Sequence, residues 1–378
     1  MKQFVIKPKI YFCEGSMEYL KEVKGNRAFI VSDAIMEKLG YLQKTIDYLQ
    51  ETGIKVDVFT EVRPDPDVKV IAAGMQSYLK TQADTIVALG GGSVIDAAKG
   101  ILYSLWQFSK AAGEEFRKPL FIAIPSTSGT GSEVTNFSVI TADGQKICLV
   151  DDWMAPDIAI LDSTCIQHVP QQVVADTGMD ALVHAIEAYV STEATYCTDA
   201  LAEKAVQLIF ENLVTLYNDT GNACARERIQ KASCLAGMAF TNANLGINHS
   251  LAHALGATFH LSHGRSNALL LSAVLEYNAN LNDPKDKRVA ERYARLAAVL
   301  QLPARTYREG TVNFLQAVKD LKKSLGIQNG LRELGIDQSK FQQELANMAE
   351  LALQDRCTPT NPRKPSKEDL IAIYQKSF

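Results

Sequence analysis

The sequence predicts an α/β domain, in which helices cover both faces of a parallel sheet, followed by an all-helical domain. Two observations lead to this fold class. Through about the first 160 residues, short runs that are apolar throughout alternate with amphipathic helical patterns, as in parallel sheets. After the apolar run 158–162 the strand signals cease, and successive helical patterns fill the remainder. We therefore expect two domains, residues 1–162 and residues 163–378.

Each element follows from its local pattern. The apolar runs that predict strands are 27–33, 56–59, 85–89, 120–124 and 158–162. Helices are expected between these runs over residues 34–52, over 66–82, and from the glycines at 90–92 through about residue 105. Ligands of such sheets bind at the carboxyl ends of the strands. The residues just after each run are therefore candidates for a binding site.

Length, charge and cysteine content narrow the class of protein. The chain has 378 residues, a formal net charge of -4 and no basic patch, which disfavours nucleic acid and anionic membranes as partners. It has no run of the roughly 18 apolar residues that a membrane-spanning helix requires. Its seven cysteines show no CxxC spacing, which fits a reducing compartment. We expect a soluble cytoplasmic protein.

Histidines gather in one stretch of the second domain. Four of the chain's six histidines lie in the fifteen residues from His249 to His263. His253 follows His249 by four positions, a spacing that on a helix puts two side chains on one face about 6 Å apart. Asp180 and His184, further upstream, have the same spacing. One carboxylate with several imidazoles suits Fe(II) or Zn(II) better than Mg(II) or Ca(II). We expect a metal site, and the spacing leaves open whether His249 or His253 binds.

Two loops that follow predicted strands suit a nucleotide. The glycines at 90–92 open a helix, where free amide groups and the helix dipole favour a pyrophosphate. The segment 125–133 follows the next strand with many hydroxyl groups and glycines. Asp33, at the end of the first strand, could accept hydrogen bonds from a ribose diol and would repel a 2′-phosphate, which favours NAD over NADP.

Each of these features has an ordinary structural alternative. The glycine turn is not GxGxxG, and both loops could merely connect a strand to a helix. A single histidine on an apolar helix is more often a core residue than a ligand. His260 is out of phase with its neighbours and is expected to be structural, whereas the clustering of the others favours a metal.

Several motifs together resemble the iron-containing (group III) alcohol dehydrogenases over nearly the whole chain. The motifs are GGGSVIDAAK, IPSTSGTGSEVT, GMDALVHAIEAYVS, NHSLAHALGATFHLSHG and the terminal NPRKP. Within that family, the stretches TDALAEKA, LAGMAF and SNALLL resemble the 1-propanol and ethanolamine-pathway alcohol dehydrogenases of bacterial microcompartments.

The resemblance implies a dehydroquinate synthase-like fold with a nucleotide-binding domain, a helical domain and a cleft between them. It implies NAD(H) and Fe²⁺, with Zn²⁺ possible, and places His253 beside the metal without ligating it. The implied metal ligands are Asp180, His184, His249 and His263. The implied cofactor contacts are Gly91, Gly92 and Ser93 at the pyrophosphate, Asp33 at the ribose, and Asp96, Ser126, Thr127, Thr130 and Lys146 elsewhere.

We therefore expect an NAD-dependent, metal-dependent alcohol dehydrogenase acting on a short-chain primary alcohol and its aldehyde, with 1-propanol and propanal the expected pair. His253 would relay the proton to solvent, since imidazole titrates in the useful range. The first alternative is a zinc-dependent glycerol or polyol dehydrogenase on the same scaffold. A lyase like dehydroquinate synthase and a non-enzymatic scaffold protein are further alternatives. A homodimer or larger homo-oligomer, a microcompartment location and shell or enzyme partners complete the expectation.

Overall fold

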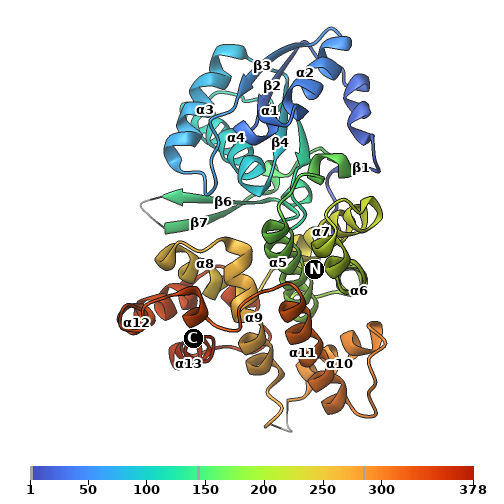
Figure 1. The fold of residues 1–378 in the computed structure, drawn as a ribbon. Coiled ribbons are helices and arrows are strands. Elements are labelled where there is room, and N and C mark those ends of the chain that lie inside the picture. The colour runs from blue at the N-terminus through green and yellow to red at the C-terminus, as the bar shows by residue number, and fades with distance from the viewer. Residues whose placement is uncertain (1–2, 143–144, 284–285) are drawn as a thin grey trace. The chain divides into compact units, whose positions relative to one another are not determined.

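The computed structural model describes residues 3–142, 145–283 and 286–378, and contacts divide them into two units. The first unit is Val5–Val169, and the second is Pro170–Phe378 together with the described residues before Val5. In Figure 1 the strands belong to the blue and green part of the chain and helices form the rest. The division lies beyond the expected boundary at residue 163, because the 3-10 turn Ser163–Ile166 buries Cys165 in a core of the first unit.

The first unit contains the predicted parallel sheet. Every strand pair in it is parallel, in the order β1-β8-β5-β4-β2-β3. The predicted strands appear as β2 (Arg27–Val31), β3 (Lys55–Phe59), β4 (Thr85–Gly90), β5 (Leu120–Pro125) and β8 (Ile158–Leu161). The edge strand β1 (Lys9–Phe12) was not predicted, because its sequence KIYF gives a run of only three apolar residues.

Helices cover both faces of the sheet, as predicted. Alternate residues of β2 point to opposite faces, so Phe29 belongs to one buried cluster and Ile30 to the other. One face is covered by α3 (Val68–Thr81) and α4 (Gly92–Ala112). The opposite face is covered by the 3-10 helix η1 (Ser16–Glu22), α1 (Ala34–Lys38) and α2 (Tyr41–Glu51). The single helix expected over 34–52 is divided because Gly40 adopts φ +80°, a left-handed conformation that ends α1.

A two-stranded hairpin follows the sheet strand β5. Strands β6 (Phe137–Ala142) and β7 (Gln145–Val150) pair antiparallel, as the sequence pattern of this segment suggests. The turn residues 143–144 lie outside the described part of the chain. Short 3-10 helices, η2 (Ser132–Val134) and η3 (Asp152–Met154), flank the hairpin.

The sheet order brings the predicted nucleotide motifs to one edge. Strand β2 lies between β3 and β4. After β2 the chain forms β3 on one side of it and then β4 on its other side, which makes this edge a topological switch point. Asp33 follows β2, and the glycine turn follows β4. The hydroxyl-rich loop follows β5, whose Pro125 is in register with Gly90. Three adjacent strands therefore present the three motifs at their carboxyl ends.

The second unit is helical, as predicted from residue 163 onward. Helix α5 is buried along its length from Gly178 to Val190, and Gly178 allows the close approach of α6, because a Cβ there would lie 2.3 Å from Leu213. A buried apolar cluster joins α8, α9, α12 and α13. The helices are α5 (Gln171–Val190), α6 (Tyr196–Asn218), α7 (Ala223–Ala243), α8 (Ile247–Phe259), α9 (His263–Ala279), α10 (Arg288–Val299), α11 (Tyr307–Ser324), α12 (Gln338–Gln354) and α13 (Lys367–Lys376). Among the described residues, no helix has the combined length and apolar character needed to cross a membrane.

Candidate metal centre and nucleotide-binding loops

The four predicted metal ligands come together inside the helical unit. Asp180 and His184 lie on α5, His249 lies on α8, and His263 is the first residue of α9. One potential ligand atom from each residue can be chosen so that all four atoms lie within 4.8 Å of one another. Three of the side chains are buried and His263 is partly exposed. The cluster therefore combines one carboxylate with three imidazoles around a small volume.

The start of α9 is fixed against α5, which brings His263 into the cluster. A Cβ on Gly264 would lie 2.3 Å from the carbonyl oxygen of Asp176, so only glycine permits this approach. Ser262 caps α9 by accepting from the N–H of Arg265, and its hydroxyl donates to Asp176. Arg265 also forms an ion pair of 2.7 Å with Asp176. These contacts explain why a histidine at the head of a helix reaches the cluster.

His249 has the geometry of a metal-binding imidazole. Its Nδ1 lies 2.5 Å from Oε2 of Glu187, and when Nδ1 donates its proton there, the lone pair remains on Nε2. That Nε2 is buried and has no hydrogen-bond partner among the residues that the structure describes, although Oδ1 of Asp180 lies 3.8 Å away. A buried nitrogen without a partner is costly unless something else binds it. A divalent ion would satisfy it, so the residues present fit a metal.

The electrostatics of the cluster also suit a cation. Burial, followed by the neighbouring imidazoles of His184, His263 and His253, holds the pKa of His249 well below its usual range. The ring is therefore neutral at physiological pH, the form that binds metal. Burial raises the pKa of Glu187 to about 8, against the opposing effect of backbone N–H groups, and a cation near His249 would favour the Glu187 carboxylate.

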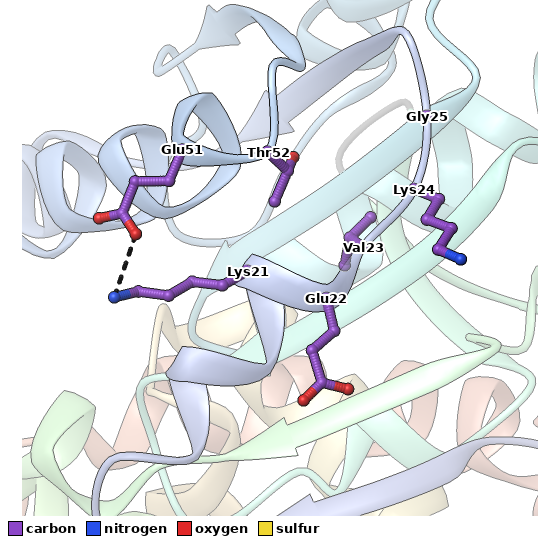
Figure 2. Close-up of a pocket in the computed structure, with 7 residues that line it drawn as sticks. All are labelled: Lys21, Glu22, Val23, Lys24, Gly25, Glu51 and Thr52. Carbon is purple, nitrogen blue, oxygen red and sulfur yellow. Dashed lines mark ion pairs between the residues drawn. The ribbon is translucent and has the colours of Figure 1, made fainter.

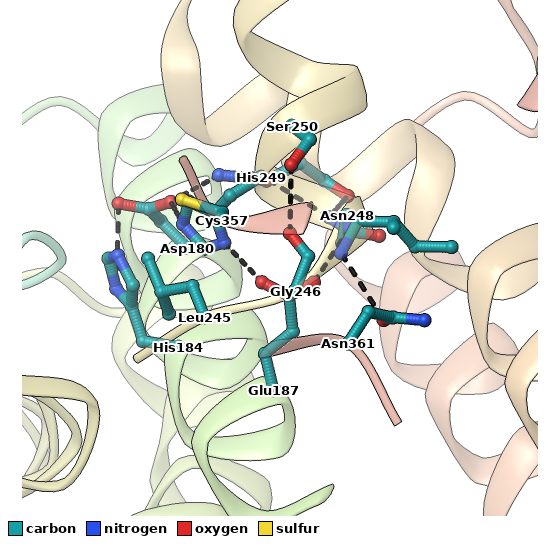
Figure 3. A network of polar contacts seen from close by, with 12 residues as sticks. Asp180, His184, Glu187, Leu245, Gly246, Asn248, His249, Ser250, Cys357 and Asn361 are labelled. Carbon is teal, nitrogen blue, oxygen red and sulfur yellow. Dashed lines mark hydrogen bonds and ion pairs between the residues drawn. The ribbon is translucent and has the colours of Figure 1, made fainter. Parts of the chain in front are cut away.

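A layer of polar side chains behind the cluster was not predicted. Figure 3 shows Glu187 next to both His249 and Asn248, with Asp180 on the other side of the His249 ring. Asn248 donates to Asn267, and Asn267 donates to Asp180 over 2.7 Å. The spacing of seven residues between Asp180 and Glu187, two helical turns, was the signal that could have identified Glu187.

His253 lies beside the four-residue cluster without belonging to it. Its ring stacks on that of His263 with centroids 5.3 Å apart, and its Nδ1 lies 2.8 Å from Oδ2 of Asp355. Burial raises the pKa of Asp355, but the hydrogen bond and charge of His253 and the N–H of Cys357 outweigh it, and the net pKa falls to about 2. Asp355 therefore holds the His253 ring through Nδ1. His260 ends α8 in a left-handed conformation. It belongs neither to the four-residue cluster nor to the group of His253, Asp355 and Cys357, consistent with its expected structural role.

The two nucleotide loops lie against each other in the first unit. Gly91 caps α4, whose first N–H groups have no acceptor within the helix. A Cβ on Gly92 would lie 2.5 Å from Thr130, and a Cβ on Gly91 would lie 3.3 Å from Thr127. The N–H of Ser126 donates to the carbonyl of Gly90. The glycines therefore permit close packing of the two loops and leave the N-terminus of α4 available to an anion.

Asp96 and Lys99, on α4, bind the segment that follows the hydroxyl-rich loop. The carboxylate oxygens of Asp96 accept from the Ser132 hydroxyl at 2.6 Å and from the Val139 N–H at 3.0 Å. The Lys99 ammonium group donates to the carbonyls of Ser132 and Phe137 and to two hydroxyl groups, over 2.6–3.0 Å. Both side chains hold protein groups here, so the cofactor contact expected of Asp96 stays a prediction.

The remaining predicted cofactor residues have protein partners at their sites. Oδ1 of Asp33 caps α1 by accepting from two backbone N–H groups at 2.9 Å. The Lys146 ammonium group forms a 2.8 Å ion pair with Asp65, whose N–H also approaches the Ser93 hydroxyl at 3.4 Å. A cofactor bound by Lys146 would compete with this ion pair.

A surface pocket in the first unit contains none of these motifs (Figure 2). An ion pair of 3.1 Å between Lys21 and Glu51 crosses one side of it. Its lining residues are Lys21, Glu22, Val23, Lys24, Gly25, Glu51 and Thr52.

Two family models of known proteins match nearly all of the chain. Residues 7–163 match the family model of iron-containing alcohol dehydrogenase, and residues 174–378 match that of the C-terminal part of the Fe-containing alcohol dehydrogenase family. The NADPH-dependent butanol dehydrogenase of Clostridium saccharobutylicum is 39% identical over 99% of this chain and 97% of its own length. The 1-propanol dehydrogenase PduQ of Citrobacter freundii is 38% identical over 96% of each.

A longer relative and a solved structure show the same likeness. The aldehyde-alcohol dehydrogenase 2 of Entamoeba histolytica is 38% identical over 100% of this chain, which spans 47% of that protein. The crystal structure of a 1,3-propanediol oxidoreductase matches with a TM-score of 0.91 and 33% identity, covering 100% of both chains. The motifs, the fold and the two family models agree, and this chain belongs to the iron-containing alcohol dehydrogenase family.

Proposed function

We propose that this protein interconverts a short-chain primary alcohol and its aldehyde, using NAD(H) and a divalent metal ion. Asp180, His184, His249 and His263 would hold the ion. The observation that carries the proposal is the buried Nε2 of His249, for which the described part of the chain offers no hydrogen-bond partner and which lies beside three other potential ligands. Such a nitrogen has a physical explanation when a cation occupies the cluster.

The donor set favours iron and permits zinc. One carboxylate and three imidazoles are borderline ligands that bind Fe(II), Zn(II) and related ions. When bound, the ion would supply Lewis acidity toward the substrate oxygen, and the nicotinamide would supply or accept the hydride. The membership of the chain in the iron-containing family supports iron as the first candidate.

His253 is the proposed proton carrier. Asp355 holds its Nδ1, so the second ring nitrogen is available to exchange a proton with substrate or solvent. Its side chain is 11% exposed, which gives a limited route to water. Stacking on the ring of His263 keeps it next to the proposed metal ligands without adding a fifth ligand.

Asp33 supports NAD over NADP. One oxygen of its carboxylate caps α1, which fixes the side chain at the carboxyl end of β2, where ribose-binding carboxylates occur. A 2′-phosphate near this carboxylate would be repelled. One relative is named an NADPH-dependent enzyme, so the preference must be measured for this chain.

The substrate rests on relatives rather than on a binding pocket. We propose propanal and 1-propanol, because two proteins named 1-propanol dehydrogenase are 38% identical over 96% and 100% of this chain. The solved relative named 1,3-propanediol oxidoreductase favours keeping a diol among the candidates, as the polyol alternative does. The homo-oligomer and the microcompartment location stay predictions.

The decisive experiment combines metal analysis with a substrate panel. The protein is purified without oxygen, its bound metals are quantified, and NADH and NADPH oxidation are followed with propanal, butanal and dihydroxyacetone, and NAD reduction with glycerol. We expect iron and NADH oxidation with propanal. Zinc with preferred turnover of glycerol would establish the polyol alternative. Absence of both nucleotide binding and turnover in metal-loaded protein would refute the proposal and favour a non-enzymatic role.

A further inference from the structure

Three helices of the second unit are connected by one buried chain of hydrogen bonds. It begins at His249 on α8, whose Nδ1 faces Oε2 of Glu187 on α5. The other oxygen of Glu187 accepts from the N–H of Asn248 at 2.6 Å. The Asn248 side chain donates to Oδ1 of Asn267 on α9 at 2.9 Å, and Asn267 donates to Oδ1 of Asp180 at 2.7 Å. Because Asp180 is also on α5, the chain starts and ends on candidate ligands.

The Glu187 half of this network determines how His249 presents its ring. A carboxylate that accepts from Nδ1 fixes both the rotation of the imidazole and the tautomer that leaves Nε2 without a proton. The backbone N–H of Asn248 holds the same carboxylate from its other oxygen, so Glu187 cannot rotate away without losing two bonds. Gly246 permits this position, because a Cβ there would lie 2.9 Å from Oε1 of Glu187.

The Asn267 half determines how Asp180 presents its carboxylate. The Asn267 amide group donates to Oδ1 of Asp180 and also lies 3.2 Å from Nε2 of His263. Its own oxygen is occupied by Asn248, which fixes the direction of the amide. One amide therefore meets two candidate ligands that come from different helices.

Because these side chains are buried, losing one of their hydrogen bonds costs more free energy than losing a hydrogen bond at the surface. Asn248 and Asn267 are 0% exposed and Glu187 is 4% exposed, so water cannot readily replace a lost partner. Neither Glu187 nor Asn267 belongs to the group of four atoms that could surround an ion. Glu187 instead contacts the His249 ring, and Asn267 donates to the Asp180 carboxylate.

We infer that Glu187 and Asn267 are positioning residues, which hold the His249 ring and the Asp180 carboxylate in the arrangement that binds metal. The inference rests on the proposed metal site and adds to it the residues that preorganise it. Partners of this kind typically contribute about 10- to 100-fold to metal affinity. Removing either should therefore weaken metal binding even though all four candidate ligands remain.

The test measures Zn²⁺ affinity directly. The metal is removed with a chelator, and Zn²⁺ is titrated into wild type, Glu187→Gln and Asn267→Leu in competition with a chromogenic chelator. Glu187→Gln keeps the volume of the side chain but replaces one acceptor oxygen with an amide donor. Asn267→Leu keeps the branched shape of the side chain, but its methyl groups neither donate to Asp180 nor accept from Asn248. We expect dissociation constants raised about 10- to 100-fold in both, with a changed absorption spectrum when Co²⁺ replaces Zn²⁺.

Asn212→Leu is the matched control. Asn212 is also a buried amide of this unit, but it joins α6 to Arg228 on α7 and contacts none of the candidate ligands. It should lower the melting temperature of the metal-free protein without changing Zn²⁺ affinity. If Glu187→Gln does not fold, Asn267→Leu decides the inference.

The outcomes separate this inference from the proposed function. A wild-type protein that does not bind Zn²⁺ or Fe²⁺ would overturn the proposed function and this inference with it. Tight binding by the wild type with affinities within about threefold of it in both variants would overturn only the positioning role, since the expected loss is at least tenfold.

Discussion

Among the described residues two lysines are buried, and replacing them should affect stability differently. Lys99 is completely buried below the nucleotide loops, and Lys322, on α11, is 4% exposed. Burial lowers the pKa of each to about 8, although for Lys99 the charges of Asp96 and Glu133 oppose the shift. The net pKa shifts of the two ammonium groups are therefore similar, although burial lowers the pKa of Lys99 against opposing charges and that of Lys322 without them. Their hydrogen bonding differs, because Lys99 has four acceptors at 2.6–3.0 Å and Lys322 has the Leu269 carbonyl at 3.4 Å.

Replacing each lysine by methionine isolates that difference. Both variants remove a buried charge whose net pKa shift is similar, so the relief of that net penalty largely cancels between them. Lys99→Met additionally removes the ammonium donor from the carbonyls of Ser132 and Phe137, at about 1–3 kcal/mol for each lost bond. The free energy of unfolding should therefore fall about 2–6 kcal/mol further in Lys99→Met than in Lys322→Met, for which we expect no loss or a gain. Lys99→Met should also raise KM for NAD, because it releases the loop that carries Thr130.

The effect of Lys322 on the free energy of unfolding should depend on pH. Its folded pKa of about 8 lies below the usual lysine value of 10.5, so the destabilising effect of the buried charge, about 3 kcal/mol, is fully present below pH 8 and is relieved as pH rises toward 10.5. Urea unfolding of wild type and variants, followed by circular dichroism, measures this. Fluorescence of Trp106 and Trp153, the chain's two tryptophans, reports the unit that contains Lys99. Equal loss in both methionine variants, or a Lys322→Met advantage that does not shrink above pH 8, would refute the reasoning.

Three further predictions concern the site and the cofactor. His263→Ala should lose metal and activity together, as measured by metal content and NADH oxidation; an active, metal-free variant would rule out this ligand. Asp33→Ser should reduce the preference for NAD over NADP by about tenfold or more in kcat/KM, since about 1.4 kcal/mol corresponds to tenfold; an unchanged ratio would show that Asp33 does not contact the ribose. Gly264→Ala should separate α9 from α5 at Asp176 and weaken Zn²⁺ binding while the first unit unfolds as in wild type; unchanged affinity would mean that the backbone shifts elsewhere.

The sheet could be predicted because its strands are buried on both faces and therefore form continuous apolar runs. The same rule explains the omission of β1, an edge strand whose residues are half exposed or exposed. The break between α1 and α2 was missed because a glycine in a helical pattern does not itself show that it adopts a positive φ. Contacts divide the chain after Val169, because the 3-10 turn Ser163–Ile166 packs in the first unit, and the domain boundary expected near residue 163 stays a prediction.

The spacing of four residues pairs Asp180 with His184 and His249 with His253, and the resemblance implied the set of four candidate ligands. Glu187 could not be recognised by type, since a glutamate in a helix is ordinarily exposed, and its burial against Asn248 depends on another helix, α8. Asn267 has the same limitation, although it follows His263 by one helical turn. The resemblance implied that Asp96 contacts the cofactor; in the structure its two oxygens accept from Ser132 and Val139, and the cofactor contact stays a prediction.

The candidate ligands and their positioning residues all come from helices between residues 171 and 279, inside one unit. The glycine turn, the hydroxyl-rich loop and Asp33 all come from the other unit. The proposed metal site and the proposed nucleotide site would thus be encoded by separate segments of the chain. A mutation in one segment can abolish turnover and leave the opposite binding event intact. Inactive variants of this chain can accordingly be sorted into two classes, those that lose metal and those that lose nucleotide binding, by measuring metal content and nucleotide affinity on the same sample.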